Sequence, residues 1–274
     1  MSLLLNRALY AADLAMGRIL GDRCPNCSRR PECPPLLTRH HGFSPVYACE
    51  GCGVYYRPAA FRGGRVLKLY YSLFYNERGI TTEMPAQADR SAILASVLGS
   101  EKDRSPDVRR LLGSQRASIC VYGCSWGYEL LPLVDLGHRV VGIEIGSTRR
   151  TFGRDRLGLE IVATAGEAVE ILGSVDLLLS SHVLEHVPRL DHLLDQVDTI
   201  LAPRRQIHFT PSVEDVGRNP LFDSIIGREH PLGVTRRFWE RRARRSGLDL
   251  SFEVRGQSAS SCGEACAVLI RGAN

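Results

Sequence analysis

The feature that most constrains the fold is a regular alternation of short apolar runs and helical stretches after Ala117. Five runs rich in β-branched residues cover positions 118–122, 139–145, 159–163, 175–180 and 206–210. Such alternation is typical of a mostly parallel sheet with helices on its faces. Two later runs, 248–254 and 265–270, lie closer together and predict an antiparallel pair at the sheet edge. We therefore expect an open, doubly wound α/β sheet.

A group of cysteines precedes this region. Cys24-Pro-Asn-Cys27 and Cys49-Glu-Gly-Cys52 form two Cys-x-x-Cys pairs with 21 residues between them. Four thiolates can close a tetrahedral zinc site, and a short segment with little apolar core needs such support. We predict a structural zinc bound by Cys24, Cys27, Cys49 and Cys52. Unrelated thiols or a redox pair are the alternative, and Cys33 lies outside both pairs.

Composition divides the chain into three zones. Residues 1–59 are expected to hold an amphipathic N-terminal helix and the zinc module, and residues 114–274 the α/β domain. Between them, residues 60–113 read as a helical connecting region. Its Tyr70, Tyr71 and Tyr75 either form a lid over a ligand or belong to a core.

A glycine-containing turn follows the first predicted strand of the sheet. The turn reads Gly123-Cys124-Ser125-Trp126-Gly127. A dinucleotide fingerprint would need glycine at Ser125 and Tyr128, whereas the spacing G-x-G-x-G is met at its first and last positions. Glu144 ends the next strand, where a carboxylate can accept both hydroxyls of a ribose. The two features together predict a ribose-bearing cofactor; the alternative is an ordinary turn and a solvated glutamate.

The stretch from Val175 to Val187 adds a more specific signal, because Val183-Leu184-Glu185-His186-Val187 follows the fourth strand. It resembles the corresponding segment of bacterial small-molecule class I S-adenosylmethionine-dependent methyltransferases. Ile200-Leu201-Ala202-Pro203 and the run from Gln206 to Ser212 match the next helix end and the fifth strand of those enzymes. The similarity spans residues 117–272. A cysteine module ahead of such a domain is typical of methyltransferases of glycan, deoxysugar and surface-polysaccharide pathways.

The resemblance implies a Rossmann-like, seven-stranded sheet with strand order 3-2-1-4-5-7-6 and S-adenosylmethionine as cofactor. Ser125 stands where the family has a glycine, although its N–H and hydroxyl can still bind. The implied cofactor-binding positions are Gly123, Cys124, Ser125, Gly127, Glu144, Ile145, Ser181 and His182.

Two histidines are the candidates for a base that assists methyl transfer. His182 follows the fourth strand, at the edge where open α/β sheets bind ligands. His230 lies in a loop that resembles acceptor-site segments of sugar and polyketide methyltransferases, ahead of a helix with Thr235 as its expected N-cap. The alternative for His230 is a loop histidine without a chemical role. We expect Glu185 and His186 to orient the loop.

The expected acceptor is a small molecule: a sugar, a nucleotide sugar or a glycan end. The alternatives are an RNA methyltransferase that holds its substrate with the zinc module and an arginine-rich helix at 236–245, and a non-catalytic scaffold. Nucleic acid is the less favoured partner, because the net charge is only +5 and the arginines could form a solvated face. No apolar run reaches the 18–20 residues of a membrane span, and no export signal is seen. We expect a cytoplasmic protein.

Overall fold

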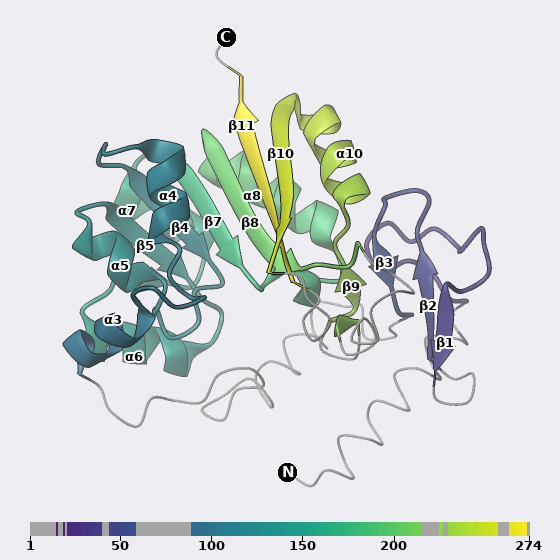
Figure 1. Ribbon diagram of the computed structural model, residues 1–274, viewed down its shortest axis with the longest axis horizontal. Coiled ribbons are helices and arrows are strands. Elements are labelled where there is room, and N and C mark those ends of the chain that lie inside the picture. Colours follow the sequence, from purple (N-terminus) through teal and green to yellow (C-terminus); the bar gives the residue numbers. More distant parts are fainter. Residues whose placement is uncertain are drawn as a thin grey trace, which may run out of the picture. The chain divides into compact units, whose positions relative to one another are not determined.

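The computed structural model describes residues 15, 19, 21–39, 44–58, 89–214, 225–226, 230–256 and 263–272 (Figure 1). Most of the expected N-terminal helix and the tyrosines of the expected lid, Tyr70, Tyr71 and Tyr75, lie outside these residues. The chain divides into two compact units, one of Met1–Val66, His182–Asp195 and His208–Asn274, the other of Leu67–Ser181 and Gln196–Ile207. Within the described ranges, no helix combines the length and apolar character needed to cross a membrane.

The main sheet has the strand order that the sequence resemblance implied. Its strands are β4 (Ser118–Tyr122), β5 (Arg139–Ile143), β6 (Ile161–Val162), β7 (Leu177–Ser181), β8 (Arg205–Pro211), β10 (Leu248–Arg255) and β11 (Glu264–Arg271). They are arranged as β10-β11-β8-β7-β4-β5-β6, which is 3-2-1-4-5-7-6 read from the other edge. β4 pairs in parallel with β5 and β7, and β10 pairs antiparallel with β11. The predicted doubly wound, mostly parallel sheet is therefore confirmed.

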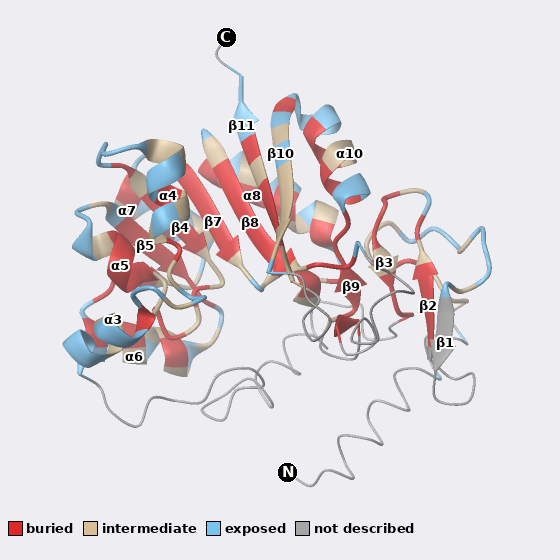
Figure 2. Ribbon diagram, in the orientation of Figure 1, coloured by how far each residue is buried: buried red, intermediate tan, exposed pale blue. Residues whose placement is uncertain are grey.

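The unit that holds β4–β7 is built from strands buried on both faces. Ile119, Cys120 and Val121 of β4 have no exposed surface, because helices cover the sheet. Figure 2 shows much of this sheet as buried. The helices of this unit are α3 (Arg90–Val97), α4 (Ser105–Leu112), α5 (Leu130–Asp135), α6 (Ser147–Leu157) and α7 (Ala165–Leu172). α5 and α7 pack against β5, and α6 packs against β6. Thr164 caps the start of α7 by accepting the N–H of Glu167.

In the other unit, the cysteine segment forms a second sheet with a strand from much later in the chain. β1 (Leu37–Arg39), β2 (Ser44–Ala48), β3 (Tyr55–Tyr56) and β9 (Leu232–Gly233) follow one another in this sheet. Tyr55 pairs with Gly233 and Tyr56 with Leu232. A Cβ atom at Gly233 would lie 2.7 Å from Ile226 Cδ1, so a larger residue there would make the Ile226 side chain shift. The sequence did not indicate this pairing.

The larger hydrophobic core of the same unit includes the cysteines. It joins Cys24, Cys49 and Cys52 to Phe238 and Trp239 and to residues of β11. Among its described residues, the helices are η1 (Leu184–His186, 3-10), α8 (Leu190–Leu201), which ends beyond the unit, and α10 (Arg236–Ser246), which packs against β10. Thr235 caps α10 as predicted, since its side chain accepts the N–H of Phe238. The cysteine module thus shares its core with elements of the methyltransferase-like sheet.

Candidate functional site

The turn after β4 has a left-handed backbone at three alternate positions. The φ angles are 73° at Gly123, 52° at Ser125 and 90° at Gly127. Glycine adopts this region without cost, whereas serine is strained there. The N–H groups of Gly123 and Cys124 both donate to the Ile143 carbonyl, at 2.7 and 3.1 Å. These two amides therefore hold the turn against β5.

Close packing explains the glycines around the turn. A Cβ at Gly127 would lie 2.6 Å from Leu159 Cδ1, and one at Gly142 would lie 2.4 Å from Cys124 Sγ. The Cys124 thiol is therefore packed against β5, and burial raises its pKa well above the ordinary value. A buried neutral thiol is inert. Any contact of Cys124 with a cofactor would thus have to be made by its backbone.

Glu144 directly follows β5, and its side chain faces the turn. Its Oε2 accepts the Ser125 N–H at 2.9 Å, and its Oε1 accepts the Gly146 N–H at 2.7 Å. The side chain is buried, and burial raises the pKa of Glu144 against the opposing effect of these bonds and of Arg149. Each carboxylate oxygen can accept two hydrogen bonds, so acceptor capacity remains. Ile145, the next residue, is exposed.

Arg149 is a member of this site that the sequence did not single out. It lies on α6 with no exposed surface. Its Nη1 donates to the Ser125 hydroxyl, and its guanidinium carbon lies 4.9 Å from the centre of the Trp126 ring. A buried cation is thus placed beside the turn and balances the charge of Glu144. One arginine among many in the sequence gave no signal for this position.

Ser181, the last residue of β7, is held by a second buried arginine. Arg104 Nη2 donates to Ser181 Oγ at 2.8 Å, and Arg104 Nε lies 4.0 Å from Glu129 Oε1. Arg104 precedes α4 and is 6% exposed. The hydroxyl predicted to contact the cofactor is therefore fixed in direction by an arginine that sequence analysis missed.

His182 has an unusual backbone and two carboxylate neighbours. Its φ is 51°, a strained value of the kind that clusters at functional sites. Its Nε2 lies 2.8 Å from Glu264 Oε1, and its Nδ1 lies 3.5 Å from Glu185 Oε1. Partial burial lowers the pKa of His182. The two carboxylates have the opposite and larger effect, so the net result is a pKa raised to about 10. Glu264, on β11, was not among the predicted site residues.

His230 lies close to Glu185 and His186. The rings of His186 and His230 have their centres 4.5 Å apart, at an interplanar angle of 73°. His230 Nδ1 lies 2.8 Å from the Ile225 carbonyl oxygen. Because a carbonyl only accepts, His230 donates from Nδ1, and Nε2 keeps a free lone pair when the ring is neutral. The structure thus brings together a predicted base and two residues that we expected only to orient the loop.

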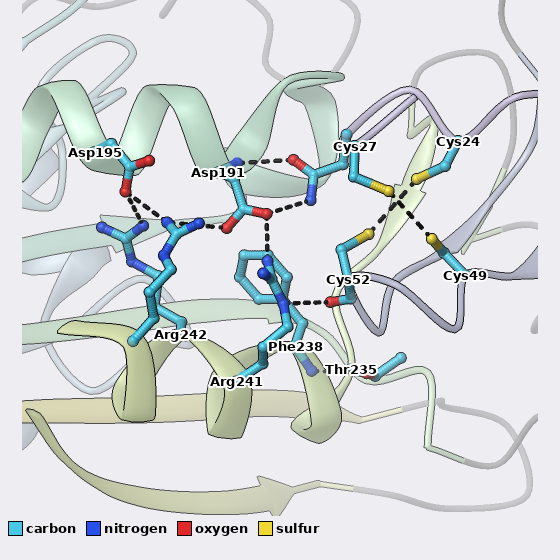
Figure 3. Close-up of polar contacts among 12 residues, drawn as sticks. Cys24, Cys27, Cys49, Cys52, Asp191, Asp195, Thr235, Phe238, Arg241 and Arg242 are labelled. Atoms are coloured by element: carbon cyan, nitrogen blue, oxygen red, sulfur yellow. Dashed lines mark hydrogen bonds and ion pairs between the residues drawn. The ribbon is translucent and has the colours of Figure 1, made fainter. Parts of the chain in front are cut away.

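The two Cys-x-x-Cys pairs converge (Figure 3). Cys24 Sγ lies 3.6 Å from Cys52 Sγ, and Cys27 Sγ lies 3.4 Å from Cys49 Sγ. Sulfurs around a tetrahedral zinc lie about 3.8 Å apart, so the four thiols fit this ion. Hydrogen bonding to Cys24 lowers the pKa of Cys27 to about 7. Cys33 is exposed and is not part of the cluster.

The arginines of α10 are engaged by carboxylates of the same unit. Arg241 pairs with Asp191 and also donates to the Cys52 carbonyl oxygen, and Arg242, which is buried, lies 2.6 Å from Asp195 (Figure 3). Further ion pairs join Arg236 to Glu240, Arg237 to Glu50 and Arg245 to Asp191 and Asp195. Much of the positive charge on this helix is therefore neutralised within the protein.

Comparisons with known proteins agree with this fold. Residues 121–209 match a family model described as a methyltransferase domain. A search of curated proteins gives no match. Among solved structures, magnesium protoporphyrin IX methyltransferase from Synechocystis, with bound S-adenosylhomocysteine, is similar over 77% of this chain and all of its own, with 12% identity and a TM-score of 0.52.

Two further similar structures have lower TM-scores. The methyltransferase domain of the bacterial protein CtHen1 has 18% identity and a TM-score of 0.47, covering 63% of this chain and 98% of its own. A methyltransferase from Archaeoglobus fulgidus has 15% identity and a TM-score of 0.49, covering 74% and 98%. The matched residues thus make 121–209 a methyltransferase domain, and the chain has the fold of a methyltransferase solved with bound S-adenosylhomocysteine.

Proposed function

We propose that this enzyme methylates a hydroxyl of a small molecule, a sugar, a nucleotide sugar or a glycan end. The observation that carries the proposal is His230, whose Nδ1 is held by the Ile225 carbonyl. The lone pair of a neutral His230 is thereby fixed on Nε2, the form that can bind or deprotonate a hydroxyl. We propose His230 and His182 as the acceptor-side histidines.

On the cofactor side, we propose that the turn after β4 and the residues at the ends of β5 and β7 hold S-adenosylmethionine. Glu144 supplies its remaining lone pairs to the ribose hydroxyls, and the exposed Ile145 supplies apolar surface. The remaining proposed contacts are Gly123, Cys124, Ser125, Gly127, Ser181 and His182.

Methyl transfer to a hydroxyl requires two things of the protein: alignment of the two substrates and a group that accepts the hydroxyl proton. The methyl carbon is already activated by the sulfonium, so an in-line arrangement alone can contribute about 7–11 kcal/mol to lowering the barrier. A hydroxyl acceptor must also lose its proton, and a general base typically adds about 10²–10⁴-fold in rate. His230, with its lone pair on Nε2, meets that second requirement.

The ion pairs of α10 favour a small acceptor over RNA. Arginines that bind a phosphate backbone must offer their charge to the ligand. Arg241 and Arg242 are instead paired with Asp191 and Asp195. An RNA substrate would have to compete with these intramolecular carboxylates.

We further propose that the four clustered cysteines bind a structural zinc. All four sulfurs belong to the protein, so a tetrahedral ion there has no open position for chemistry. Thiolates that hold zinc need a reducing compartment, which is why we place the enzyme in the cytoplasm.

The cofactor half of the proposal is tested by titrating S-adenosylhomocysteine into the wild type and the Glu144→Ala variant. Loss of a charged acceptor should weaken binding by more than about 1 kcal/mol, which is at least about fivefold in Kd. The matched control is Glu170→Ala, which removes an exposed glutamate of α7. Unchanged affinity in Glu144→Ala would remove Glu144 from the ribose role.

The acceptor half is tested with methyl-labelled S-adenosylmethionine and a panel of nucleotide sugars, with RNA as the competing acceptor. We expect label on a nucleotide sugar and none on RNA. Label on RNA, with binding that weakens steeply as salt rises, would instead support the RNA methyltransferase.

A further inference from the structure

The side chains of Glu185, His186 and His230 form a cluster with the composition of a metal site. One carboxylate oxygen and one nitrogen from each imidazole all lie within 4.8 Å of one another. Glu185 and His186 are consecutive residues of η1, and His230 comes from the loop ahead of β9, which packs against η1. The ligands are therefore carried by elements that already touch.

Glu185 supplies an independent observation that points to a missing ligand. The residue is 1% exposed, yet among the described residues neither of its carboxylate oxygens has a hydrogen-bond partner. Its Oε1 is ion-paired with His182, whose Nδ1 lies 3.5 Å away, so the hydrogen-bonding capacity that is left unused is chiefly that of Oε2. A buried carboxylate is costly unless it is hydrogen-bonded, paired or bound to a metal.

The hydrogen bond of His230 to the Ile225 carbonyl is of the kind that orients a metal-binding histidine. Metal-binding histidines almost always donate their other ring N–H to a carbonyl, a carboxylate or water, which fixes the tautomer and the ring orientation. His230 Nδ1 makes this contact with Ile225, which leaves Nε2 as the ring nitrogen that can bind an ion. The Ile225 side chain is itself buried in a small core with Val46 and Val213.

From these observations, we propose that Glu185, His186 and His230 bind a divalent first-row transition ion, separate from the four-cysteine site. Two imidazoles and one carboxylate favour such ions over Mg²⁺ or Ca²⁺, which prefer oxygen ligands. Three protein ligands leave at least one coordination position open, as in catalytic rather than structural sites. The open position takes an oxygen of the acceptor.

The role of the ion rests on the proposed function, although its binding does not. A hydroxyl bound to a divalent ion loses its proton more readily, because the cation stabilises the alkoxide. The proton passes to solvent and the oxygen keeps the electron pair. An O–CH3 bond then forms as the S–CH3 bond breaks, which leaves S-adenosylhomocysteine as a neutral thioether. His230 would then act as a ligand and not as the base.

The test uses Mn²⁺, because this ion disfavours thiolate sites and its binding is read directly from the loss of the free-ion signal in electron paramagnetic resonance. Full-length protein already loaded with zinc is titrated with Mn²⁺. We expect the wild type to bind Mn²⁺, and Zn²⁺ to displace it, since Zn²⁺ binds such ligands more tightly. Glu185→Gln and His230→Gln should each weaken Mn²⁺ binding at least tenfold.

His192→Gln is the matched control, since His192 is an exposed histidine of α8, and it should bind Mn²⁺ like the wild type. His230→Gln keeps the site testable if the buried Glu185→Gln variant does not fold, because His230 is only half-buried. Wild-type protein that binds no Mn²⁺, or equal binding by the His230→Gln variant, overturns the site. If that protein still bound S-adenosylhomocysteine and methylated a sugar, the proposed function would stand without the metal.

Discussion

Asn26 and Asp191 hydrogen-bond to each other twice. Asn26 Nδ2 donates to Asp191 Oδ2 at 2.9 Å, and Asn26 Oδ1 accepts the backbone N–H of Asp191 at 2.8 Å. Asn26 lies inside the first Cys-x-x-Cys pair, and Asp191 lies in the first turn of α8. N–H groups of a first helical turn have no partner within the helix. The cysteine module therefore supplies part of the N-terminal cap of a helix of the main fold.

Removing this contact should destabilise the protein. We expect Asn26→Ala to lower the free energy of unfolding by about 1–3 kcal/mol, since it leaves part-buried polar groups without their partners. In an Asp191→Ala background, the same substitution should lower the free energy of unfolding by a smaller amount. It should still lower it, because the backbone N–H of residue 191 still donates to Asn26 Oδ1. Urea denaturation of the four proteins in this double-mutant cycle measures the difference. Equal costs in both backgrounds would show that the Asn26 amide gains nothing from the Asp191 carboxylate.

Loss of the zinc that we propose for the cysteine site should weaken α10 as well as the module itself. Cys52 and Phe238 share one core, and Thr235 at the start of α10 donates to the Gly53 carbonyl. We expect Cys49→Ser to abolish the thiolate-to-metal charge-transfer band of the cobalt-substituted protein and to speed hydrogen exchange in α10.

Cys33→Ser is the control for this experiment, because Cys33 is exposed and lies outside the cluster. It should keep both the band and the exchange protection of the wild type. Normal α10 protection in Cys49→Ser would mean that the helix is held without the metal.

The strands of the main sheet were predictable because parallel strands buried on both faces read as nearly continuous apolar runs. The run at 118–122 coincides with β4. The edge run at 248–254 is one residue shorter than β10 at one end, and the run at 265–270 is one residue shorter than β11 at each end. β9 is different, since it has only two residues and is defined by its partner Tyr55–Tyr56. Pairing between segments so distant in the chain leaves no periodicity to detect.

The candidate site was predictable only where its residues stand close together in the sequence. The paired cysteines show their chemistry through their spacing, and Glu185 and His186 belong to a recognisable motif. Their proximity to His230 depends on the packing of β9 against η1, which the sequence does not express. The same holds for Arg241, whose partner Asp191 lies on another helix. The sequence showed the arginine-rich helix α10, but it did not show which carboxylates pair with those arginines.

The strained turn at Ser125 gives a prediction that separates backbone from side chain. Ser125→Gly and Ser125→Ala both remove the hydroxyl that accepts from Arg149. Only glycine also relieves the φ of 52°, so the glycine variant should be more stable than the alanine variant by about 1 kcal/mol. At Ser96, an exposed helical residue of α3, the order should reverse by a similar amount. Urea denaturation checks both pairs of variants. If the alanine variant were the more stable one at both sites, backbone strain at Ser125 would be ruled out.

Because His208 resists protonation in the folded protein, the free energy of unfolding should fall in mild acid. The imidazole is buried and stacks on Trp239, with ring centres 5.0 Å apart. Burial, and then the charge of Arg242, lower the pKa of His208 to about 3. The unfolded chain, with a histidine pKa of about 6.5, therefore binds one more proton than the folded chain between these two pH values.

It follows that stability contributed by neutral His208 is complete above pH ~6.5 and declines by about 1.4 kcal/mol for each pH unit below it. We expect the free energy of unfolding of the wild type to drop about 2 kcal/mol more than that of His208→Gln between pH 6.5 and 5. Comparing the two proteins by urea denaturation removes the contributions of all other titrating groups. Parallel pH profiles would mean that His208 is protonated in the folded protein, and that the Trp239 stack accommodates an imidazolium beside Arg242.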